Sequence, residues 1–397
     1  MKRTTVGAYE PSFAAGENCH AFVPAALPPD PPLAIDAFLQ EKLDRAHLAL
    51  GQLNGVSRFL PDASTLLYTF IRKEAVLSSN IEGTQSSLSD LLMFEADAAP
   101  GVPIDDVREV SSYVQALETG MALLAQGLPP STRLLLACHR DLLAQGRGSQ
   151  KAPGEFRKTQ NWIGGDRPSR ASFVPPPPLR VMECWGHLEN FLNDIPSRTS
   201  PLIKAALAHV QFETIHPFHD GNGRIGRLLI PLVLIHDRIL QHPLLYVSLY
   251  FKRHRQTYYD LLQKVRTEGD WEAWLGFFAD AVTVSATEAV GLTELLNGLT
   301  AQDREKVKAA GRPGISALQV LDCFIRRPLL NSNQVQKLTK FALPTILRGF
   351  KLLEELGIIR EITNRQRNRL YCYGKYLDLL NKEPDSHGTD QESAEAD

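Results

Sequence analysis

The sequence predicts a mainly α-helical protein with a short β-hairpin flap, followed by a small C-terminal winged-helix domain. Three observations support this fold class. Apolar residues recur at helical spacing from about Ala34 to Leu299. The helical pattern breaks once, over residues 163–174, where β-branched and aromatic residues lie between glycines and prolines. Residues 313–376 end in two strand-like runs around a polar turn, which is typical of a winged helix.

Composition argues against several classes of protein. The chain has 397 residues and a formal net charge of -2, so it is not attracted as a whole to nucleic acid or to a membrane surface. Its five cysteines are scattered without a CxxC pair, which argues against a disulfide framework and a structural zinc site. No long apolar run predicts a membrane span, and the N-terminus lacks the apolar core of a signal peptide. We therefore expect a cytoplasmic location and no membrane contact.

Residues 1–100 are expected to form an N-terminal helical region. Residues 1–35 are rich in proline and small residues, so we expect an irregular strap there. Helical periodicity follows, and a second helix is predicted from about Ser64 to Glu82 with Gly83 as its C-terminal cap.

Residues 101–299 are expected to form the helical core. Amphipathic stretches predict helices on both sides of the break in the pattern. The segment from about Ile163 to Val174 is predicted to form the flap, and four prolines after it, Pro175 to Pro178, stiffen the chain. Such a flap suits the docking of an extended peptide by strand addition. The alternative is a plain surface loop.

Residues 300–312 are charged and end in AAGRPG, which predicts a linker before a winged-helix domain at 313–376. Residues 311–376 hold twelve Lys/Arg and four Asp/Glu, a net charge of +8. Five basic residues fall in the predicted recognition helix and wing: Arg348, Lys351, Arg365, Arg367 and Arg369. This pattern favours DNA binding, and docking on a protein partner or on the core explains it equally well. Residues 377–397 form an acidic tail whose end is expected to be disordered.

The segment HPFHDGNGRIGR, from His216 to Arg227, combines groups suited to chemistry on phosphates. The proline after His216 disfavours a helical conformation there, which places the imidazole at a loop where it can accept a proton near neutral pH. Asp220 is a hard oxygen ligand suited to Mg²⁺ shared with phosphates. The glycine-rich turn leads into a helix, so successive N–H groups can face an anion. Arg224 and Arg227 lie three residues apart and can reach the same phosphate chain.

Other interpretations of this segment are weaker. The pattern GxGxxG occurs in it, but a helix rather than a strand precedes the glycines, which argues against a dinucleotide-binding fold. An EF-hand loop would need Glu where Pro231 stands. His216 and His219 have no matching set of Cys or Glu residues for zinc. The segment therefore indicates a nucleotidyl or phosphoryl transferase.

This segment resembles the signature of the Fic family, which has the Fic/Doc fold. The family pattern HxFx(D/E)GNGRxxR matches His216 to Arg227 at every defined position. The stretches PGEFRKTQNWIGG and YYDLLQKVRTEGDWEAWLGFF resemble the family's lead into the flap and the helices after the motif. The resemblance covers nearly the whole chain. It implies a Fic-type helical domain and the activity of a protein adenylyltransferase.

The resemblance also implies a role for each matched position. His216 would deprotonate a Ser, Thr or Tyr hydroxyl of a target protein, which attacks the α-phosphate of ATP and releases pyrophosphate. Asp220 would hold Mg²⁺. The implied nucleotide-binding residues are Gly221, Asn222, Gly223, Arg224, Arg227 and Tyr259. Tyr259 would lie against the adenine. Some relatives have Asn where this chain has Arg266, so Arg266 is left out of the predicted site.

A second motif resembles the family's inhibitory pattern (S/T)xxxE(G/N). Ser78, Glu82 and Gly83 match it, and Ser78 and Glu82 lie four residues apart on one helical face. The resemblance implies that Glu82 pairs with Arg227, which would otherwise hold the γ-phosphate of ATP. The alternative is an ordinary helix end with a solvent-facing glutamate.

Several partners and activities stay open. A target protein is expected to dock at the flap, and self-AMPylation, a homodimer and DNA binding by the winged helix are further expectations. In some relatives the inhibitory glutamate also supports removal of AMP, and other relatives use a phosphocholine donor. The rival hypothesis is a DNA-binding transcriptional regulator whose Fic domain only senses nucleotide. His216 favours the enzyme, because sensing needs the anion cradle but no base.

Overall fold

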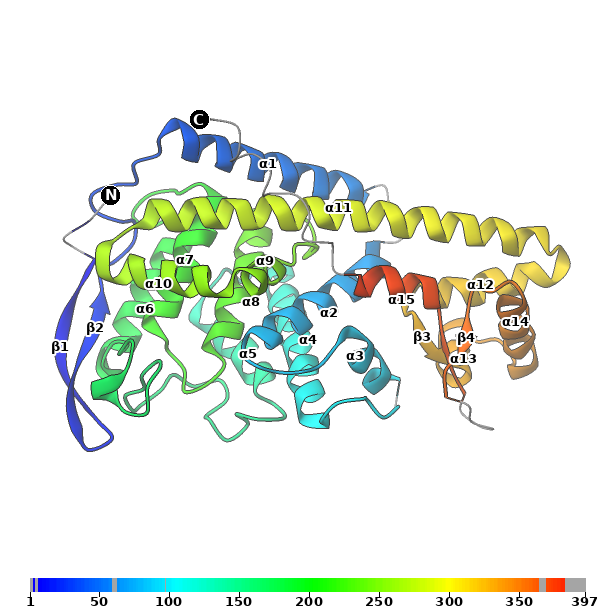
Figure 1. The fold of residues 1–397 in the computed structure, drawn as a ribbon, viewed down its shortest axis with the longest axis horizontal. Helices are drawn as coiled ribbons and strands as arrows, with labels where there is room; N and C mark the ends of the chain where they lie inside the picture. Colours follow the sequence, from blue (N-terminus) through cyan, green and yellow to red (C-terminus); the bar gives the residue numbers. More distant parts are fainter. Residues whose placement is uncertain (1–2, 4–5, 59–62, 97, 364–368, 383–397) are drawn as a thin grey trace, which may run out of the picture. The chain divides into compact units, whose positions relative to one another are not determined.

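The computed structural model describes residues 3, 6–58, 63–96, 98–363 and 369–382. The chain divides into two compact units, Met1–Ala289 and Val290–Asp397, here called unit 1 and unit 2. Both are mainly helical, as predicted (Figure 1).

Most helices of unit 1 lie where the sequence predicts them. They are α1 (Ala37–Arg58), α2 (Ala63–Ile81), α3 (Leu88–Glu95), α4 (Ile104–Ala125), α5 (Thr132–Leu142), η1 (Pro168–Arg170), α6 (Pro178–Leu192), α7 (Pro201–Ile215), α8 (Asn222–His236), α9 (Ser248–Arg253) and α10 (Arg255–Glu268). The helix α11 (Trp271–Ala309) crosses the boundary between the units. Gly83 follows α2 with a φ of +100°, a conformation that glycine adopts without strain, which agrees with its predicted place at the end of the helix.

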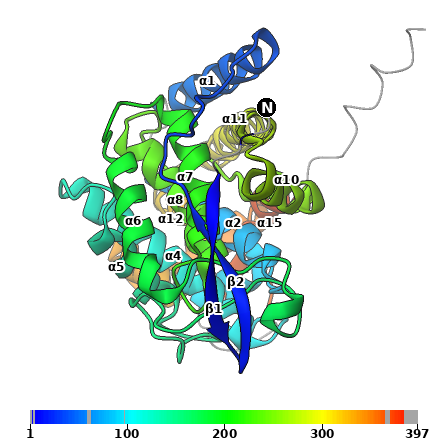
Figure 2. The same ribbon diagram turned by 90° about the vertical axis from the view of Figure 1, so that its left-hand side faces the viewer.

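The expectation of an irregular strap over residues 1–35 is wrong for residues 7–24. They form an antiparallel hairpin of β1 (Gly7–Ala14) and β2 (Glu17–Pro24), joined by Ala15 and Gly16 with φ angles of +50° and +84°. Positive φ at both turn residues matches the right-handed twist of the flanking strands. Figure 2 shows the hairpin outside the helices, where β2 packs against α6 and α7. A proline in β1 hides this strand from a reading of the sequence.

The core of unit 1 is built around α7 and α8, which pack against each other (Figure 1). Nearly every side chain of both helices is buried. Both helices carry apolar residues on all of their faces, which is typical of a helix at the centre of a core. The chain turns between them over residues 216–221. The C-terminal end of α7 and the N-terminal end of α8 therefore meet at one loop, and that loop carries the motif.

Unit 2 contains α12 (Arg312–Arg326), β3 (Leu329–Asn331), α13 (Ser332–Thr339), α14 (Leu343–Glu355), β4 (Arg360–Glu361), β5 (Leu370–Cys372) and α15 (Gly374–Asn381). The strands form an antiparallel sheet in the order β3–β5–β4. The predicted element types are present, while the winged-helix assignment stays a prediction. Arg348 and Lys351 are exposed on α14. Arg365, Arg367 and the end of the acidic tail lie outside the described residues.

The predicted linker at residues 300–312 is wrong over most of its length, because α11 continues to Ala309. The reason is that Asp303 is buried within unit 2 and accepts hydrogen bonds from the Tyr373 hydroxyl at 2.8 Å and the Lys306 Nζ at 2.6 Å. Charged residues that looked like a solvated linker thus belong to a helix with a buried polar contact.

The helix α11 is the one described helix that is long and apolar enough to cross a membrane by length and composition. Within α11, 56% of the most apolar 18-residue window is buried inside the protein. A buried core helix passes the same test, so this finding is weak evidence for a membrane span and the expectation of none stays a prediction.

Candidate active site

His216 lies at the C-terminal end of α7, in the left-handed conformation with φ +48° and ψ +59°. Its side chain is half-buried, and Nδ1 is buried without a hydrogen-bond partner among the described residues. Burial, together with the nearby Arg266 and Arg157 guanidinium groups, lowers the pKa of His216 from the usual 6.5 to about 3. The imidazole is therefore neutral at pH 7 and can accept a proton.

Asn222 closes the loop after His216. Its Nδ2 donates to the Phe218 carbonyl oxygen and its Oδ1 accepts from the Phe218 N–H, both at 2.8 Å. The side chain is only 3% exposed. Asn222 therefore shapes the loop with its side chain, so the predicted contact with phosphate would have to come from its backbone N–H at the start of α8.

His139 on α5 contacts the same loop at Phe218 and Asp220. It stacks on the Phe218 ring with centroids 3.6 Å apart and planes within 7°. The Gly154 N–H donates to its Nδ1 at 2.9 Å, so Nε2 carries the proton and donates to the Asp220 carbonyl oxygen at 3.0 Å. Burial lowers the pKa of His139 to about 4. The ring is therefore neutral at pH 7, and because both of its nitrogens are hydrogen-bonded it has a structural role rather than that of a second base.

Arg157 ties the motif to the chain that leads into the flap. Its Nε donates to the His216 carbonyl oxygen at 2.9 Å and its Nη2 donates to the Pro176 carbonyl oxygen at 2.5 Å. Close by, Asn161 Nδ2 donates to the Phe218 carbonyl oxygen at 3.0 Å. Arg157 is 2% exposed. These contacts make the residues before the flap part of the active-site wall.

The N-terminal end of α8 forms an anion site. Gly221 precedes the helix with φ +77°, a conformation that favours glycine. The first N–H groups of a helix have no carbonyl partner within it and attract negative charge. The Glu82 carboxylate lies against this end of α8. A Cβ atom added to Gly223 would stand only 2.2 Å from Glu82 Oε1. Gly223 is therefore needed for close approach of an anion to this helix end.

Arg227 is the centre of the contact between α8 and α2. Its Nε donates to Ser78 Oγ at 2.8 Å, and its Nη2 donates to the Ser78 carbonyl oxygen at 3.0 Å and to Glu82 Oε1 at 2.7 Å. The Arg227 side chain is 1% exposed and that of Glu82 is 38% exposed. Burial opposes ionisation of Glu82, but Arg227 outweighs it and holds the pKa of the carboxyl below its usual value. The ion pair predicted from the two motifs is present.

Arg224 and Asp220 lie together beside this pair. Arg224 Nη2 donates to Asp220 Oδ1 and Nη1 donates to Glu109 Oε2 on α4, both at 3.3 Å. Asp220 Oδ1 also accepts from the Gly221 N–H at 2.5 Å. Its other oxygen lies against Gly148, where an added Cβ would stand 2.8 Å away. One carboxylate oxygen is thus held by the loop while the half-buried side chain keeps the other for a further ligand.

Tyr259 is 39% exposed on α10. Burial raises the pKa of its hydroxyl, the negative charge of Glu82 adds to this, and Arg227 opposes it. These electrostatic interactions place Tyr259 near the Glu82–Arg227 pair. Its place beside the adenine stays a prediction. The Arg255 guanidinium carbon lies 5.7 Å from the centre of its ring.

A closed metal site is not present in the part of the chain that the structure describes, where no three His, Cys, Asp or Glu side chains converge. A Mg²⁺ ion that keeps waters and shares substrate phosphates needs only one or two protein carboxylates. Asp220 fits that kind of site.

The predicted flap is a loop with a single β-bridge rather than a regular hairpin. The Ile163 N–H donates to the Phe173 carbonyl oxygen at 2.8 Å and the Phe173 N–H donates back at 3.2 Å. Between them, residues 168–170 form the short helix η1. The glycines and prolines that marked the segment in the sequence also prevent a longer strand.

The structure brings together the catalytic, nucleotide-binding and inhibitory residues predicted from the sequence, and it adds others. His139, Arg157, Asn161 and Arg266 hold the loop or the flap and were not predicted as site residues. Arg157 lies in the stretch PGEFRK, which the sequence marks only by its resemblance to the family's lead into the flap. A buried charge on a loop would have been the signal, but burial is not visible in the sequence.

Comparison with known proteins assigns the family. Residues 40–122 match the model of the Fic/DOC family N-terminal region, and residues 129–234 match the model of the Fic/DOC family. The chain therefore contains a Fic/DOC domain and its N-terminal region. The second match contains the whole motif from His216 to Arg227, and the first contains Ser78 and Glu82.

Relatives and solved structures of the Fic family agree with this assignment. The protein adenylyltransferase Fic of Aedes aegypti is 32% identical over 244 residues, which cover 60% of this chain and 45% of that protein. The protein of the same name from Drosophila grimshawi is 33% identical over 206 residues, covering 51% and 39%. The chain thus spans less than half the length of these relatives.

Two solved structures support the Fic fold. A Fic family protein from Desulfovibrio desulfuricans G20 has a TM-score of 0.56 at 20% identity and covers 86% of this chain and 97% of its own. Fic-1 (aa134 - 508) from C. elegans has a TM-score of 0.51 at 23% identity and covers 65% and 74%.

Proposed function

We propose that this chain transfers AMP from ATP to a hydroxyl group of a protein target, and that Glu82 inhibits the transfer in the resting protein. The observation that carries the proposal is the placement of a neutral His216 at the same loop as the anion site of α8. The relatives named protein adenylyltransferase Fic support it.

His216 acts as the general base. It accepts the proton of the target hydroxyl while that oxygen forms a bond to the α-phosphorus of ATP. The bond from the α-phosphorus to the bridging oxygen breaks, and pyrophosphate leaves. A positioned base of this kind contributes about 10²–10⁴ in rate.

The phosphates bind at the start of α8. The N–H groups of the first turn, shaped by Gly221, Asn222 and Gly223, stabilise negative charge without reorganisation. Arg224 and Arg227 supply two guanidinium groups on the same helix end. Asp220 would hold Mg²⁺, which would neutralise charge on the phosphates.

Glu82 inhibits the enzyme by occupying this site. Its carboxylate lies against Gly223 and pairs with Arg227 at 2.7 Å. An anion already sits where a phosphate of ATP needs to bind, so ATP binding requires Glu82 to leave. Competition between Glu82 and ATP would keep this chain inactive although its motif from His216 to Arg227 is complete.

Incubation of the Glu82→Gly protein with labelled ATP and Mg²⁺, alone and with cell lysate, tests the transfer. We expect protein-linked AMP that disappears when His216→Ala is added, while ATP binding measured by calorimetry remains. Equal labelling with and without His216 would contradict a role as base. Absence of labelling from the Glu82→Gly protein on itself and on lysate proteins would contradict the transfer.

We also propose that unit 2 is a winged-helix domain that binds DNA. The exposed Arg348 and Lys351 on α14 and the exposed Arg369 beside β5 support it. Phosphate contacts make such binding sensitive to salt. Retention on DNA at low salt, lost at moderate salt and weakened by Arg348→Ala, is the expected result. No retention at low salt would leave a protein partner as the role of this unit. We further propose a cytoplasmic location and a homodimer.

A further inference from the structure

The flap, residues 163–174, is held weakly by its own backbone. Ile163 and Phe173 exchange two hydrogen bonds, and they form the one bridge described within it. A two-stranded hairpin is marginally stable in water even when regular. The flap therefore needs support from other elements if it is to stay in place for docking.

The N-terminal hairpin supports one edge of the flap. The Phe22 N–H on β2 donates to the Val174 carbonyl oxygen at 2.8 Å. Because successive residues of a strand point to opposite edges, Val174 faces away from Ile163 while Phe173 faces toward it. The hairpin is therefore hydrogen-bonded to the edge of the flap that faces away from Ile163. On the other edge, the backbone groups of Trp162 and Gly164 have no hydrogen-bond partner among the described residues.

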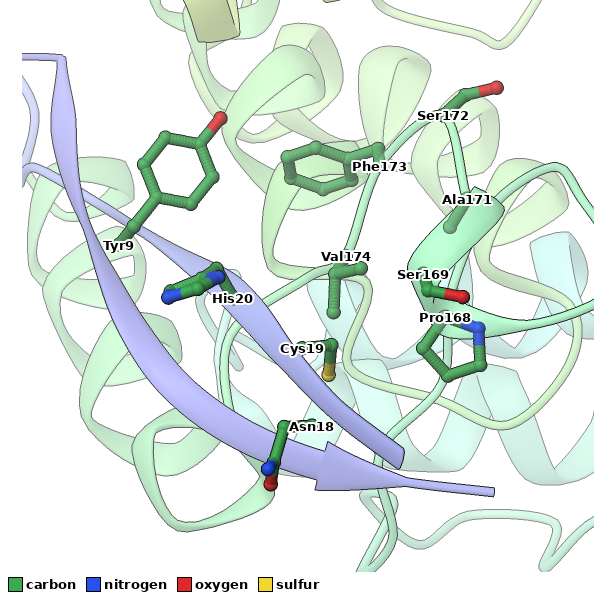
Figure 3. Close-up of a pocket in the computed structure, with 10 residues that line it drawn as sticks. All are labelled: Tyr9, Asn18, Cys19, His20, Pro168, Ser169, Ala171, Ser172, Phe173 and Val174. Carbon is green, nitrogen blue, oxygen red and sulfur yellow. The ribbon is translucent and has the colours of Figure 1, made fainter. Parts of the chain in front are cut away.

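Between the backbones of the flap and the hairpin this is the one hydrogen bond described, and the Ser169 N–H of the flap also donates to Glu17 Oε1 on β2 at 3.1 Å. A cavity of about 390 Å³ lies between the flap and β2, lined by Asn18–His20 on β2 and by flap residues between Pro168 and Val174. Figure 3 shows Ser172–Val174 alongside the strand that carries Cys19 and His20, with space between them. The ring of Phe173 lies at the end of this space. Side-chain packing must therefore provide most of the support.

Phe173 is packed between two residues from distant parts of the chain. Its ring lies 6.0 Å from the ring of Phe22 in an edge-to-face arrangement, and the Arg266 guanidinium carbon lies 4.2 Å from its centre on another side. Phe173 is 5% exposed and Phe22 is 2% exposed. Gly7 lets the Phe22 ring in, because an added Cβ there would stand 2.5 Å from it.

Arg266 connects this packing to the catalytic base. It extends from α10, where its Nη2 donates to the Glu213 carbonyl oxygen at 3.0 Å and its Nε donates to Thr214 Oγ1 at 3.2 Å. Both acceptors lie in the last turn of α7, just before His216. A single guanidinium therefore contacts the flap and the helix end that holds the base.

We propose that Phe22 and Arg266 are positioning residues for the protein substrate. By clamping Phe173, they hold the flap against the end of α7, so that an extended segment of the target, added at the free Trp162–Gly164 edge, brings its hydroxyl to His216. This inference rests on the proposed AMP transfer. The proposed ATP site at α8 includes no flap residue, so we expect the clamp to act on the protein substrate and to leave nucleotide binding unchanged.

Hydrogen exchange tests the clamp independently of activity. Phe22→Leu removes the ring contact, and Phe13→Leu is the matched control, because Phe13 lies on the same hairpin and is 65% exposed. The amides of Ile163 and Phe173 are expected to exchange about three- to tenfold faster in Phe22→Leu and at the wild-type rate in Phe13→Leu. Equal exchange in both variants would overturn the clamp. Arg266→Lys, which keeps the charge but loses the planar stacking, provides a second variant with the same expectation.

Activity then tests what the clamp does. In the Glu82→Gly protein, Phe22→Leu is expected to lower protein-linked AMP about fivefold and to leave the dissociation constant of ATP unchanged. A parallel loss of ATP affinity would mean a general structural role and would overturn the proposal. If the Glu82→Gly parent transfers no AMP, the proposed function fails, while the exchange experiment still decides whether the clamp exists.

Discussion

The loop that carries the motif and the flap beside it are held in different ways. In the loop, the buried side chains of Asn222, His139 and Arg157 bond to backbone groups on both sides of the turn. The flap has one bridge within itself and depends on the packing of Phe173. One region is fixed by hydrogen bonds from buried polar side chains, and the other is held mainly by the packing of its side chains on the hairpin and on Arg266.

The difference corresponds to the two substrates. The phosphates of ATP are the same at every turnover, and rigid donors that need no reorganisation stabilise charge best. A protein segment adds by backbone pairing, which tolerates small shifts of the edge. Changes in the loop should therefore damage folding and nucleotide chemistry together, whereas changes at the flap should affect the protein substrate alone.

The largest effect is expected for Asn222→Ala. It removes both hydrogen bonds to Phe218, which leaves the Phe218 N–H without a partner among the described residues, while the carbonyl oxygen keeps the bond from Asn161. The free energy of unfolding should fall by about 2–4 kcal/mol, and AMP transfer by the Glu82→Gly protein should fall at least about 100-fold. Urea unfolding and labelled ATP measure the two. The control, Asn18→Ala on the exposed face of β2, should change stability by less than about 0.5 kcal/mol, and similar values for both would contradict a rigid loop.

A smaller effect is expected for His139→Phe. The ring can still stack on Phe218, but the hydrogen bonds to the Asp220 carbonyl and from the Gly154 N–H are lost. The free energy of unfolding should fall by about 1–3 kcal/mol. Wild-type stability in urea would show that stacking alone supports the loop.

Glu213 gives a still smaller effect that depends on pH. Burial raises the pKa of this carboxyl on α7 to about 7, although Arg227 opposes the shift. A pKa raised by folding stabilises the protein below the unfolded value near 4.5, and this stability is lost as pH rises through 7. Glu213→Gln should therefore raise the free energy of unfolding on the order of 1 kcal/mol at pH 8 and have little effect at pH 4. An equal effect at both pH values would show that Glu213 is not buried as described.

The rate of AMP transfer by the Glu82→Gly protein should not change through a titration of His216 near pH 6.5, where a normal histidine titrates. Burial and the Arg266 and Arg157 charges lower the pKa of His216 to about 3. The base form therefore persists as pH falls from 8 to about 5, and kcat/KM for the Glu82→Gly protein should not decrease through a His216 titration. An apparent pKa near 6.5 that disappears in a His216 variant would contradict this environment.

The sequence predicts the parts of the molecule that depend on local patterns. The motif from His216 to Arg227, the Ser78–Glu82 spacing on α2 and the position of the flap follow from residue type and spacing, and the structure brings the first two into contact. Helices of the core follow from periodicity. These features need no knowledge of distant contacts.

Other features depend on contacts that the sequence does not display. The hairpin β1–β2 is stabilised by its packing on the flap through Phe22 and Val174, while its proline and small residues suggest irregular chain. Asp303 is helical because unit 2 buries it with Tyr373. Arg157 and Arg266 gain roles only when the flap folds back on α7.

The central claim is that Glu82 holds Arg227 away from ATP, and the most direct test compares labelling by the wild-type and Glu82→Gly proteins at equal protein and ATP concentrations. A charge-assisted hydrogen bond contributes about 1.5–3 kcal/mol, so the variant should transfer about ten- to a hundredfold more AMP and bind ATP more tightly. The His216→Ala, Glu82→Gly double variant gives the background. Equal labelling by wild type and Glu82→Gly above that background would contradict the account.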